Sequence, residues 1–273
     1  SRQIRERLEK ELETNVGLAI EFPESADVFH VSGRGEMHLS VLIETMRREG
    51  FELQVSQPSV IMKEIDGKKQ EPYEMVTIDV PDEFSGAVIE RLGKRKGEML
   101  NMVSENNSTR LEYKIPTRGL LGFRMEFITA TKGEGIIGSL FDSYGPFAGE
   151  IEKRQPGSLI SGFTGETVAF ALNNLQQRGT LFVGSGVSVY EGMVIGLSSK
   201  GNMVVNPLKS KQLTNMRSSG ADDAINLTPP MDMTLERALE FIDKDEYVEV
   251  TPDNIRIRKI FLTETERKRN KVA

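Results

Sequence analysis

The chain has 273 residues, of which 38% are hydrophobic and 28% are charged, and its formal net charge is −6 at pH 7. Such a composition is ordinary for a soluble globular protein, and the length allows two or three domains with separate cores. Without cysteine the chain has no disulfide framework and no thiolate site, and no apolar run reaches the roughly 20 residues that span a bilayer. We therefore expect a cytoplasmic protein without a membrane partner. Its acidic balance repels nucleic acid in bulk, so any contact with RNA must come from local patches.

Residues 1–62 follow the order helix, strand, strand, helix, strand. The expected elements are a helix built on Ile4, Leu8 and Leu12, strands over 17–22 and 28–32, a helix over 35–48 and a strand over 51–55. This is the order of a ferredoxin-like, or split βαβ, domain that lacks its opening strand. The chain also begins without a methionine, so we expect a fragment or a processed product.

Residues 63–147 repeat this topology with all six elements. The expected elements are a strand over 73–80, a helix from 82 to about 92, a hairpin of strands over 98–105 and 109–115, a helix over 120–128 and a strand over 136–143. The sequence therefore predicts an α+β protein that begins with two tandem ferredoxin-like domains.

The third region, residues 148–273, has a different character. Glycines punctuate short β-rich runs, which favours a small barrel or sandwich-like sheet. One main helix is expected after Pro229 and Pro230, with Thr234 at its head. This region contains 16 cations and 16 anions, against 7 and 11 in residues 1–62 and 12 and 14 in residues 63–147. It is therefore the region that a polyanion would repel least.

One window of the third region lacks acid altogether. Between Glu191 and Asp222 there is no carboxylate, while four lysines and arginines occur there. Cations of this kind meet phosphates, and amides and hydroxyls bond base edges and 2′-hydroxyls. The predicted RNA-binding residues are Lys209, Lys211, Gln212, Thr214, Asn215 and Arg217. The alternative is a solvent-exposed loop with no partner.

A second cation cluster ends the helix expected from residue 82. It consists of Arg91, Lys94, Arg95 and Lys96. Such a run either forms a solvated face that complements the helix dipole or contacts RNA backbone, and the sequence leaves both readings open.

A glycine-rich turn leads into the helix over 35–48. Gly33 and Gly35 flank Arg34, and a helix start beside an arginine is able to receive a phosphate. We favour a structural role, in which the glycines permit an unusual turn and a close helix approach. The pattern G-x-x-x-x-G-K-[ST] occurs nowhere in the chain, so we expect no nucleoside triphosphate binding and no enzymatic activity from this chain alone. His30 and His38 are the only histidines, and we expect neither a metal site nor a catalytic residue.

Several segments resemble a known family. VSGRGEMHLS (31–40) resembles the signature of the third domain of elongation-factor-G-like translational GTPases. The segments that resemble the BipA (TypA) branch of that group are MRREGFEL (46–53), IPTRGLLGFR (115–124), KQLTNMR (211–217) and MTLERALEFI (233–242). The resemblance covers essentially the whole chain, with mild departures at Met37 and Ser218, where the family commonly has leucine and alanine.

The resemblance implies that the chain is the C-terminal half of a ribosome-binding GTPase. The GTPase and second domains would lie upstream, and GTP and Mg²⁺ would bind there, with no cofactor in this chain. The family's ferredoxin-like domains dock near the factor-binding region of the large subunit, and a loop of its C-terminal domain, here Lys209 to Arg217, reaches A-site tRNA and the peptidyl-transferase region. The family acts in ribosome assembly and in stress adaptation, including cold and virulence responses.

The partners expected from this resemblance are the ribosome, large-subunit rRNA and A-site tRNA, with no small-molecule substrate. The alternative from another class is a protein-interaction module with no direct RNA contact.

Overall fold

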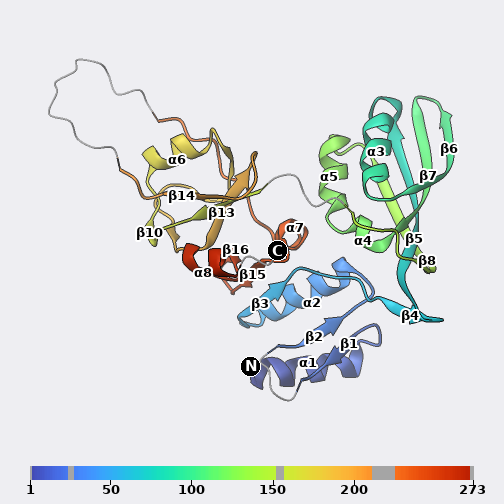
Figure 1. The fold of residues 1–273 in the computed structure, drawn as a ribbon, viewed down its shortest axis with the longest axis horizontal. Helices are drawn as coiled ribbons and strands as arrows, with labels where there is room; N and C mark the ends of the chain where they lie inside the picture. Colours follow the sequence, from blue (N-terminus) through green and yellow to red (C-terminus); the bar gives the residue numbers. More distant parts are fainter. Residues whose placement is uncertain (1, 24–27, 152–156, 211–224, 271–273) are drawn as a thin grey trace. The chain divides into compact units, whose positions relative to one another are not determined.

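The computed structural model describes residues 2–23, 28–151, 157–210 and 225–270 of the chain. Helices and strands mix throughout these ranges, which confirms the predicted α+β class (Figure 1). The chain divides into two compact units. Unit 1 comprises Ser1–Gln57, Arg154–Ala238 and Ile242–Ala273, and unit 2 comprises Pro58–Lys153 and Leu239–Phe241. No helix in the described ranges is long and apolar enough to cross a membrane.

Unit 2 is built on an antiparallel sheet with helices packed on it. Its elements are β4 (Lys63–Ile65), β5 (Lys68–Pro81), α3 (Asp82–Lys94), β6 (Glu98–Glu105), β7 (Ser108–Pro116), α4 (Thr117–Leu120), α5 (Phe123–Ala130) and β8 (Ile136–Pro146). The strands pair in the order β4-β5-β7-β6, and β8 pairs with β5. From β5 onward the chain follows the order strand, helix, strand, strand, helix, strand, with the short α4 added before α5.

The core of unit 2 follows from the alternation along its strands. Val76, Ile78 and Val80 on β5 are buried, while Thr77 between them is exposed, because successive side chains point to opposite faces of a sheet. The other buried members of this core are Val88, Leu92, Leu111, Tyr113, Ile115, Phe123 and Phe127, from α3, β7 and α5. One face of the sheet is therefore covered by α3 and α5.

Unit 1 begins with a helix and a hairpin. Its first elements are α1 (Arg2–Thr14), β1 (Ala19–Glu21), β2 (His30–Ser32), α2 (Glu36–Arg48) and β3 (Leu53–Ser56). β1 and β2 form a two-stranded antiparallel sheet. Leu8, Leu18, Leu42 and Met46 form a small core under these elements. The elements appear in the order expected for residues 1–62.

The C-terminal region of unit 1 is rich in short strands. Its elements are β9 (Gly157–Ser161), β10 (Gly165–Glu166), α6 (Ala169–Leu175), β11 (Gly179–Leu181), β12 (Ser188–Val189), β13 (Met193–Ser198), β14 (Met203–Val205), α7 (Leu235–Phe241, of which the last three residues count to unit 2), β15 (Glu246–Val250), β16 (Ile255–Lys259) and α8 (Glu264–Arg269). The expected head of α7 is present, since Thr234 Oγ1 accepts a hydrogen bond from the Arg237 backbone N–H. The helices α6 and α8 were not expected from the sequence.

The third strand of the first segment belongs to the sheet of the C-terminal region. The strand order is β14-β9-β13-β16-β15-β3, with β11 also paired to β13. β3 pairs antiparallel with β15, and Val55 lies opposite Val248. A ferredoxin-like sheet made by the first segment alone would contain β3, so this pairing is a departure from the expected arrangement. It makes residues 53–56 and the C-terminal region parts of one sheet.

Candidate nucleic-acid interface

Of the six residues predicted to bind RNA in the acid-free window, the structure places Lys209. The other five, Lys211, Gln212, Thr214, Asn215 and Arg217, lie outside the described residues. Lys209 is exposed and follows β14 by four residues. Lys209 is therefore the first cation of this set that the fold presents to solvent.

The segment that leads to Lys209 is held by the core of the C-terminal region. Val205 is buried, and its carbonyl accepts a hydrogen bond from the Gly162 backbone N–H at 2.9 Å. The Pro207 carbonyl accepts one from the Val168 backbone N–H, also at 2.9 Å. Because these bonds fix the backbone on both sides of Asn206, the position of the chain at Lys209 is set by the fold.

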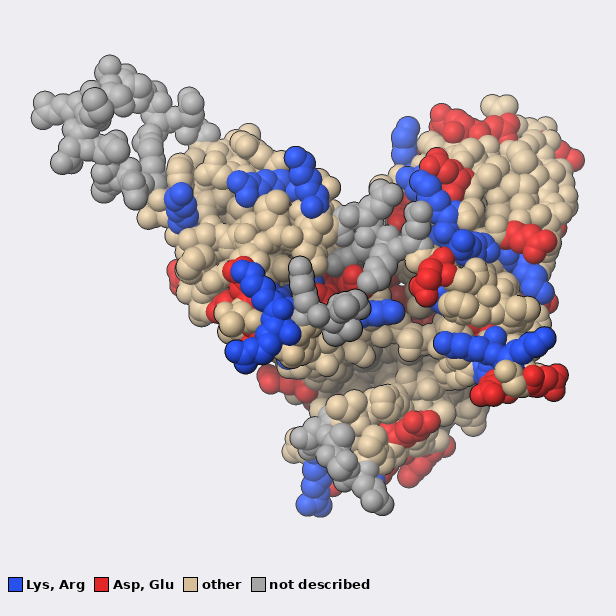
Figure 2. Space-filling view, in the orientation of Figure 1, with Lys and Arg blue, Asp and Glu red and all other residues tan. Residues whose placement is uncertain are grey.

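Cations gather on one face near this segment, while β10, which lies against Leu208, carries the exposed Glu166. Over α6 and β14, the face seen in Figure 2 shows lysine and arginine atoms and no acidic ones. Arg178, which the sequence reasoning did not single out, is brought next to the segment that carries Lys200, because β11 pairs with β13. No local pattern marks Arg178, since its position next to Lys200 depends on strand pairing.

The second cation cluster is divided among different roles. Arg95 Nη1 donates to the carbonyls of Gly119 and Leu121, at 2.8 and 2.9 Å, and Arg95 Nη2 lies 3.1 Å from Glu126. A Cβ at position 119 would lie 2.6 Å from the Arg95 carbonyl oxygen, so α4 packs closely on the end of α3. Arg95 therefore serves the packing of unit 2.

The remaining members of this cluster lie nearer to solvent. Lys94 Nζ pairs with Glu90 at 2.7 Å, and the hydrogen bond lowers the pKa of Glu90. Arg91 Nη1 donates to the Ala87 carbonyl of its own helix at 3.3 Å. Lys96 is exposed, with a positive φ of 65° at the end of α3. Lys94 and Lys96 are the more accessible cations for an RNA backbone, and Arg91 is half-buried.

The glycine-rich turn before α2 is a packed junction. The Arg34 backbone N–H donates to His38 Nδ1 at 3.2 Å, so the imidazole proton lies on Nε2, which donates to Asn15 Oδ1 at 3.1 Å. A Cβ at Gly33 would lie 2.9 Å from His38 Nδ1, so a side chain here would displace the imidazole. Gly35 has extended backbone and open space where a Cβ would be. The geometry assigns the turn to packing of α2 against the residues that follow α1.

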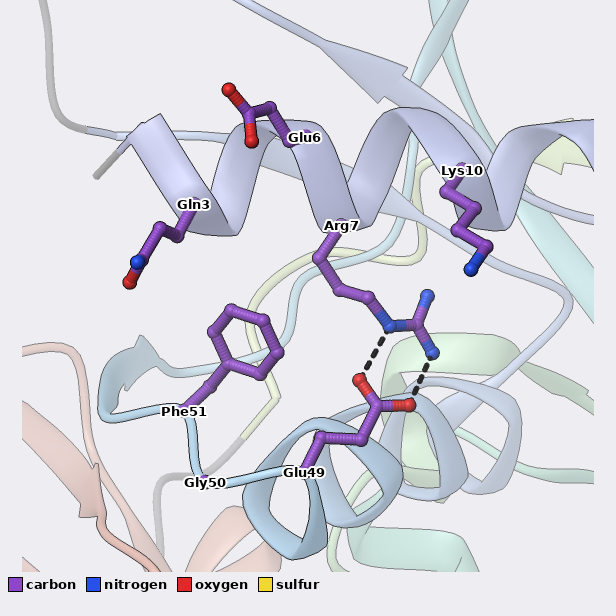
Figure 3. Close-up of a pocket in the computed structure, with 7 residues that line it drawn as sticks. All are labelled: Gln3, Glu6, Arg7, Lys10, Glu49, Gly50 and Phe51. Atoms are coloured by element: carbon purple, nitrogen blue, oxygen red, sulfur yellow. Dashed lines mark hydrogen bonds and ion pairs between the residues drawn. The ribbon is translucent and has the colours of Figure 1, made fainter.

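A shallow pocket in unit 1 lies between α1 and the end of α2 (Figure 3). Arg7 donates to both carboxylate oxygens of Glu49, at 2.5 and 2.9 Å, and also to Glu11 Oε2 at 2.9 Å. These bonds raise the pKa of Arg7 and lower the pKa of Glu49. Because Arg7 and Glu49 neutralise each other's charge, this ion pair links α1 to the end of α2.

A second hollow of unit 1 contains a compact charge cluster on α2. Glu44 accepts hydrogen bonds from Arg47 and Arg48, both at 2.8 Å, and these bonds lower the pKa of Glu44 to about 2. Arg47 Nη1 also donates to the Pro252 carbonyl at 2.5 Å, in the turn between β15 and β16. The cluster connects α2 with the C-terminal sheet, and Arg47 is committed to that connection.

Two family models match the sequence of this chain, one over most of unit 2 and one over the β-rich C-terminal region. Residues 68–155 match the elongation factor G C-terminus, and residues 156–264 match the TypA/BipA C-terminal domain. The chain thus carries C-terminal domains of the translational GTPase class. Residues 156–264 are thus a C-terminal domain of the TypA/BipA type.

Curated relatives carry the same family name. The chain is 58% identical over 272 residues to the "Large ribosomal subunit assembly factor BipA" of Escherichia coli (strain K12), a match that covers 98% of this chain and 45% of the relative. It is 57% identical over 272 residues to the protein of that name from Haemophilus influenzae, and 52% identical over 262 residues to that from Synechocystis sp.. These matches cover 98% and 95% of this chain and 44% of each relative. The chain therefore spans less than half the length of the curated relatives it matches.

Proposed function

We propose that this chain is the ribosome-binding C-terminal portion of a translational GTPase that acts in assembly of the large ribosomal subunit. The name of these relatives, "Large ribosomal subunit assembly factor BipA", supports the assembly role. In this proposal the chain acts in the cytoplasm and contributes no catalysis. Its three regions, 1–62, 63–147 and 148–273, position a cationic segment against large-subunit rRNA and A-site tRNA.

The observation that carries the proposal is the placement of Lys209. The backbone bonds at Val205 and Pro207 fix the part of the acid-free window that precedes Lys209, and Lys209 lies beyond them in solvent. Cations in such a position bind phosphates, and the amides and hydroxyls that follow in the sequence are donors for bases and 2′-hydroxyls. No Asp or Glu between Glu191 and Asp222 opposes this contact.

The test is the triple change Lys209→Ala, Lys211→Ala, Arg217→Ala in the full-length protein. We expect weaker ribosome binding and a log-log salt dependence that is flatter by up to about one unit for each lost phosphate contact. The matched control is Lys10→Ala, Lys244→Ala, Arg269→Ala, which removes the same charge from three exposed positions elsewhere in unit 1. If the two triple variants bind with equal affinity at several salt concentrations, the acid-free window does not bind RNA.

A protein-interaction module is the second candidate, favoured by one observation on unit 2. Ile136, Leu140 and Phe141 on β8 are 70%, 77% and 62% exposed, and β8 pairs only with β5 among the described strands. Exposed apolar side chains of this kind are typical of protein contacts. Two results together would support this candidate. Ribosome affinity would be unchanged in the triple variant, and it would fall when these three residues are replaced by serine.

The proposal includes a role for the parent protein in stress adaptation, with GTP and Mg²⁺ bound upstream of this chain. Deletion of the parent gene should then slow growth in the cold and leave large-subunit precursors. Rescue by the wild-type gene and failure of rescue by the triple variant would link that phenotype to the acid-free window.

A further inference from the structure

Two exposed cations lie on neighbouring segments near the start of β14, at the end of that strand away from Lys209. Arg178 precedes β11 and Lys200 follows β13, and these strands are antiparallel with Gly179 opposite Ser198. The Ser199 backbone N–H and Oγ both donate to the Arg178 carbonyl, each at 3.1 Å. Residues distant in sequence are therefore neighbours here, and we refer to them as the Arg178–Lys200 pair.

Both side chains of the Arg178–Lys200 pair are exposed and lack a carboxylate partner within the described ranges. The contact of the Arg178 guanidinium is with Met203 Sδ, at 3.4 Å. Arg110 of unit 2 is an instructive contrast, because it meets both oxygens of Asp79 at 2.7 and 2.9 Å. The positive charge of the pair is thus available to an external anion.

The chain around the pair is almost free of acid. Residues 167–190 and 192–221 contain no Asp or Glu, and Glu191 lies between them. Glu191 precedes β13 whereas Lys200 follows it, so a strand of six residues, about 20 Å long, separates the two. Glu246, which accepts a hydrogen bond from Ser158 on β9, is 1% exposed and pairs with the equally buried Lys259. The side chains seen over α6 and β14 in Figure 2 are accordingly basic or neutral.

The turn that carries Lys200 is held firmly on the sheet. Gly201 has a φ of 85°, and a Cβ at Gly157 would lie 1.9 Å from the Gly201 carbonyl carbon. The Ser158 backbone N–H donates to Asn202 Oδ1 at 2.9 Å. The backbone on both sides of Lys200 therefore keeps its place when a ligand binds, and little order has to be created on binding.

We propose that Arg178 and Lys200 form a phosphate-binding patch for RNA backbone, separate from the contact made at Lys209. A guanidinium matches a phosphate in a bidentate way, and a lysine adds a point charge. Their exposed neighbours are Gln177, Ser199 and Asn202, which are polar groups of the kind that contact phosphates and sugars. A protein partner would instead require apolar or aromatic anchors at the centre of the patch.

The patch deepens the proposed function and rests on it. β14 has three residues and spans about 10 Å, and Lys200 and Lys209 lie beyond its opposite ends. The two contacts therefore fall on different phosphates, and their contributions to the salt dependence of binding add.

The first test compares two double variants of the 273-residue chain in binding to isolated large ribosomal subunits. Arg178→Gln with Lys200→Gln should flatten the log-log salt dependence by about 1.4 to 1.8 units, since each lost phosphate contact removes about 0.7 to 0.9. The control, Lys10→Gln with Lys244→Gln, removes the same charge from exposed positions flanked by acids and should leave the slope unchanged. Unchanged melting temperatures and circular dichroism spectra in both variants establish that folding is intact.

The second test identifies the partner chemically. The chain contains no cysteine, so Gln177→Cys creates a single site for a photoreactive aryl azide next to Arg178. We expect adducts with rRNA on the large subunit, and none from the same label on Gln3→Cys of α1. Adducts with ribosomal proteins alone would overturn the RNA assignment of the patch.

The outcomes separate this inference from the proposed function. If the wild-type chain does not bind the subunit, both fail. If the wild-type chain binds the subunit, two results together refute the patch alone. The changes at Lys209, Lys211 and Arg217 weaken binding, and the changes at Arg178 and Lys200 behave like the control.

Discussion

Two arginine–carboxylate pairs in unit 2 differ in burial and predict a difference in stability. Arg118 on α4 donates to both oxygens of Glu71 on β5 and to the Gly149 carbonyl, and its guanidinium lies 4.3 Å from the Phe147 ring centroid. The side chains of Arg118 and Glu71 are 16% and 0% exposed. Arg110 and Asp79 make a similar two-bond pair on the open face of the sheet, where they are 59% and 33% exposed.

We predict that Arg118→Met destabilises unit 2 by about 3–5 kcal/mol, because Glu71 is left in a buried position without its cation. Arg110→Met should cost no more than about 1 kcal/mol, since its partner Asp79 is partly exposed and becomes hydrated. The double variant Glu71→Gln, Arg118→Met should regain part of the loss. The glutamine carries no charge, and its carbonyl oxygen still accepts the Ala148 backbone N–H, which is 2.6 Å from Glu71 Oε1 in the native chain.

The assay must suit a chain that has no tryptophan and two compact units. Urea unfolding followed by far-UV circular dichroism gives the free energies, and hydrogen exchange of β5 peptides assigns the affected transition to unit 2. If Arg118→Met does not fold, recovery of the fold in the double variant carries the same information. Free energies of unfolding of the Arg118 and Arg110 variants that agree within about 1 kcal/mol would refute the argument from burial.

Three further predictions follow from local geometry. The lowered pKa of Glu44, about 2 against an ordinary 4.5, means that its carboxylate stabilises unit 1 above pH 4.5 and that this contribution is lost as the pH falls toward 2. Thermal unfolding should show Glu44→Gln less stable than wild type at pH 7, with a difference that shrinks near pH 2; a constant difference would contradict this. Gly157→Ala should cost at least about 1–3 kcal/mol in urea unfolding, since its Cβ would overlap the Gly201 backbone, whereas Gly184→Ala, with open space, should be near neutral. Isothermal titration calorimetry of the 273-residue chain should detect no GTP binding, and saturable binding would contradict the absence of a phosphate-binding loop.

The strong local periodicities gave the most accurate predictions. The alternation of Val76, Ile78 and Val80 with polar residues marks β5, and Asn106-Asn107, both with positive φ, marks the hairpin between β6 and β7. Thr234, after two prolines, marks the start of α7. In these elements the side chains that define the pattern are the same ones that fold into the core.

Local sequence patterns did not predict the long-range strand pairing or the short helices. Nothing near Val55 in the sequence shows that β3 joins β15, because the partner lies almost 200 residues away. The helix α6, of seven residues, is too short to establish a period. For α8 a signal existed, since Thr263 and Glu266 form a capping box.

In the candidate site, too, local sequence reveals some residues and only the packing reveals others. The acid-free window, and with it Lys209, is visible in composition alone. Arg178 is not, because it is a single arginine whose meaning comes from the β11–β13 register. Arg95 was grouped with its neighbours in sequence, and its bonds to the Gly119 and Leu121 carbonyls emerge only from the packing of α4 on α3.

The proposed function requires that the C-terminal region binds ribosomal RNA through its cationic segment. The decisive experiment is chemical footprinting of ribosomal RNA, with and without A-site tRNA. It compares the wild-type full-length protein with the triple variant changed at Lys209, Lys211 and Arg217. We predict a set of large-subunit rRNA nucleotides that the wild type protects and the triple variant leaves reactive, while the remaining protections persist. Identical protection patterns for the two proteins would contradict the claim.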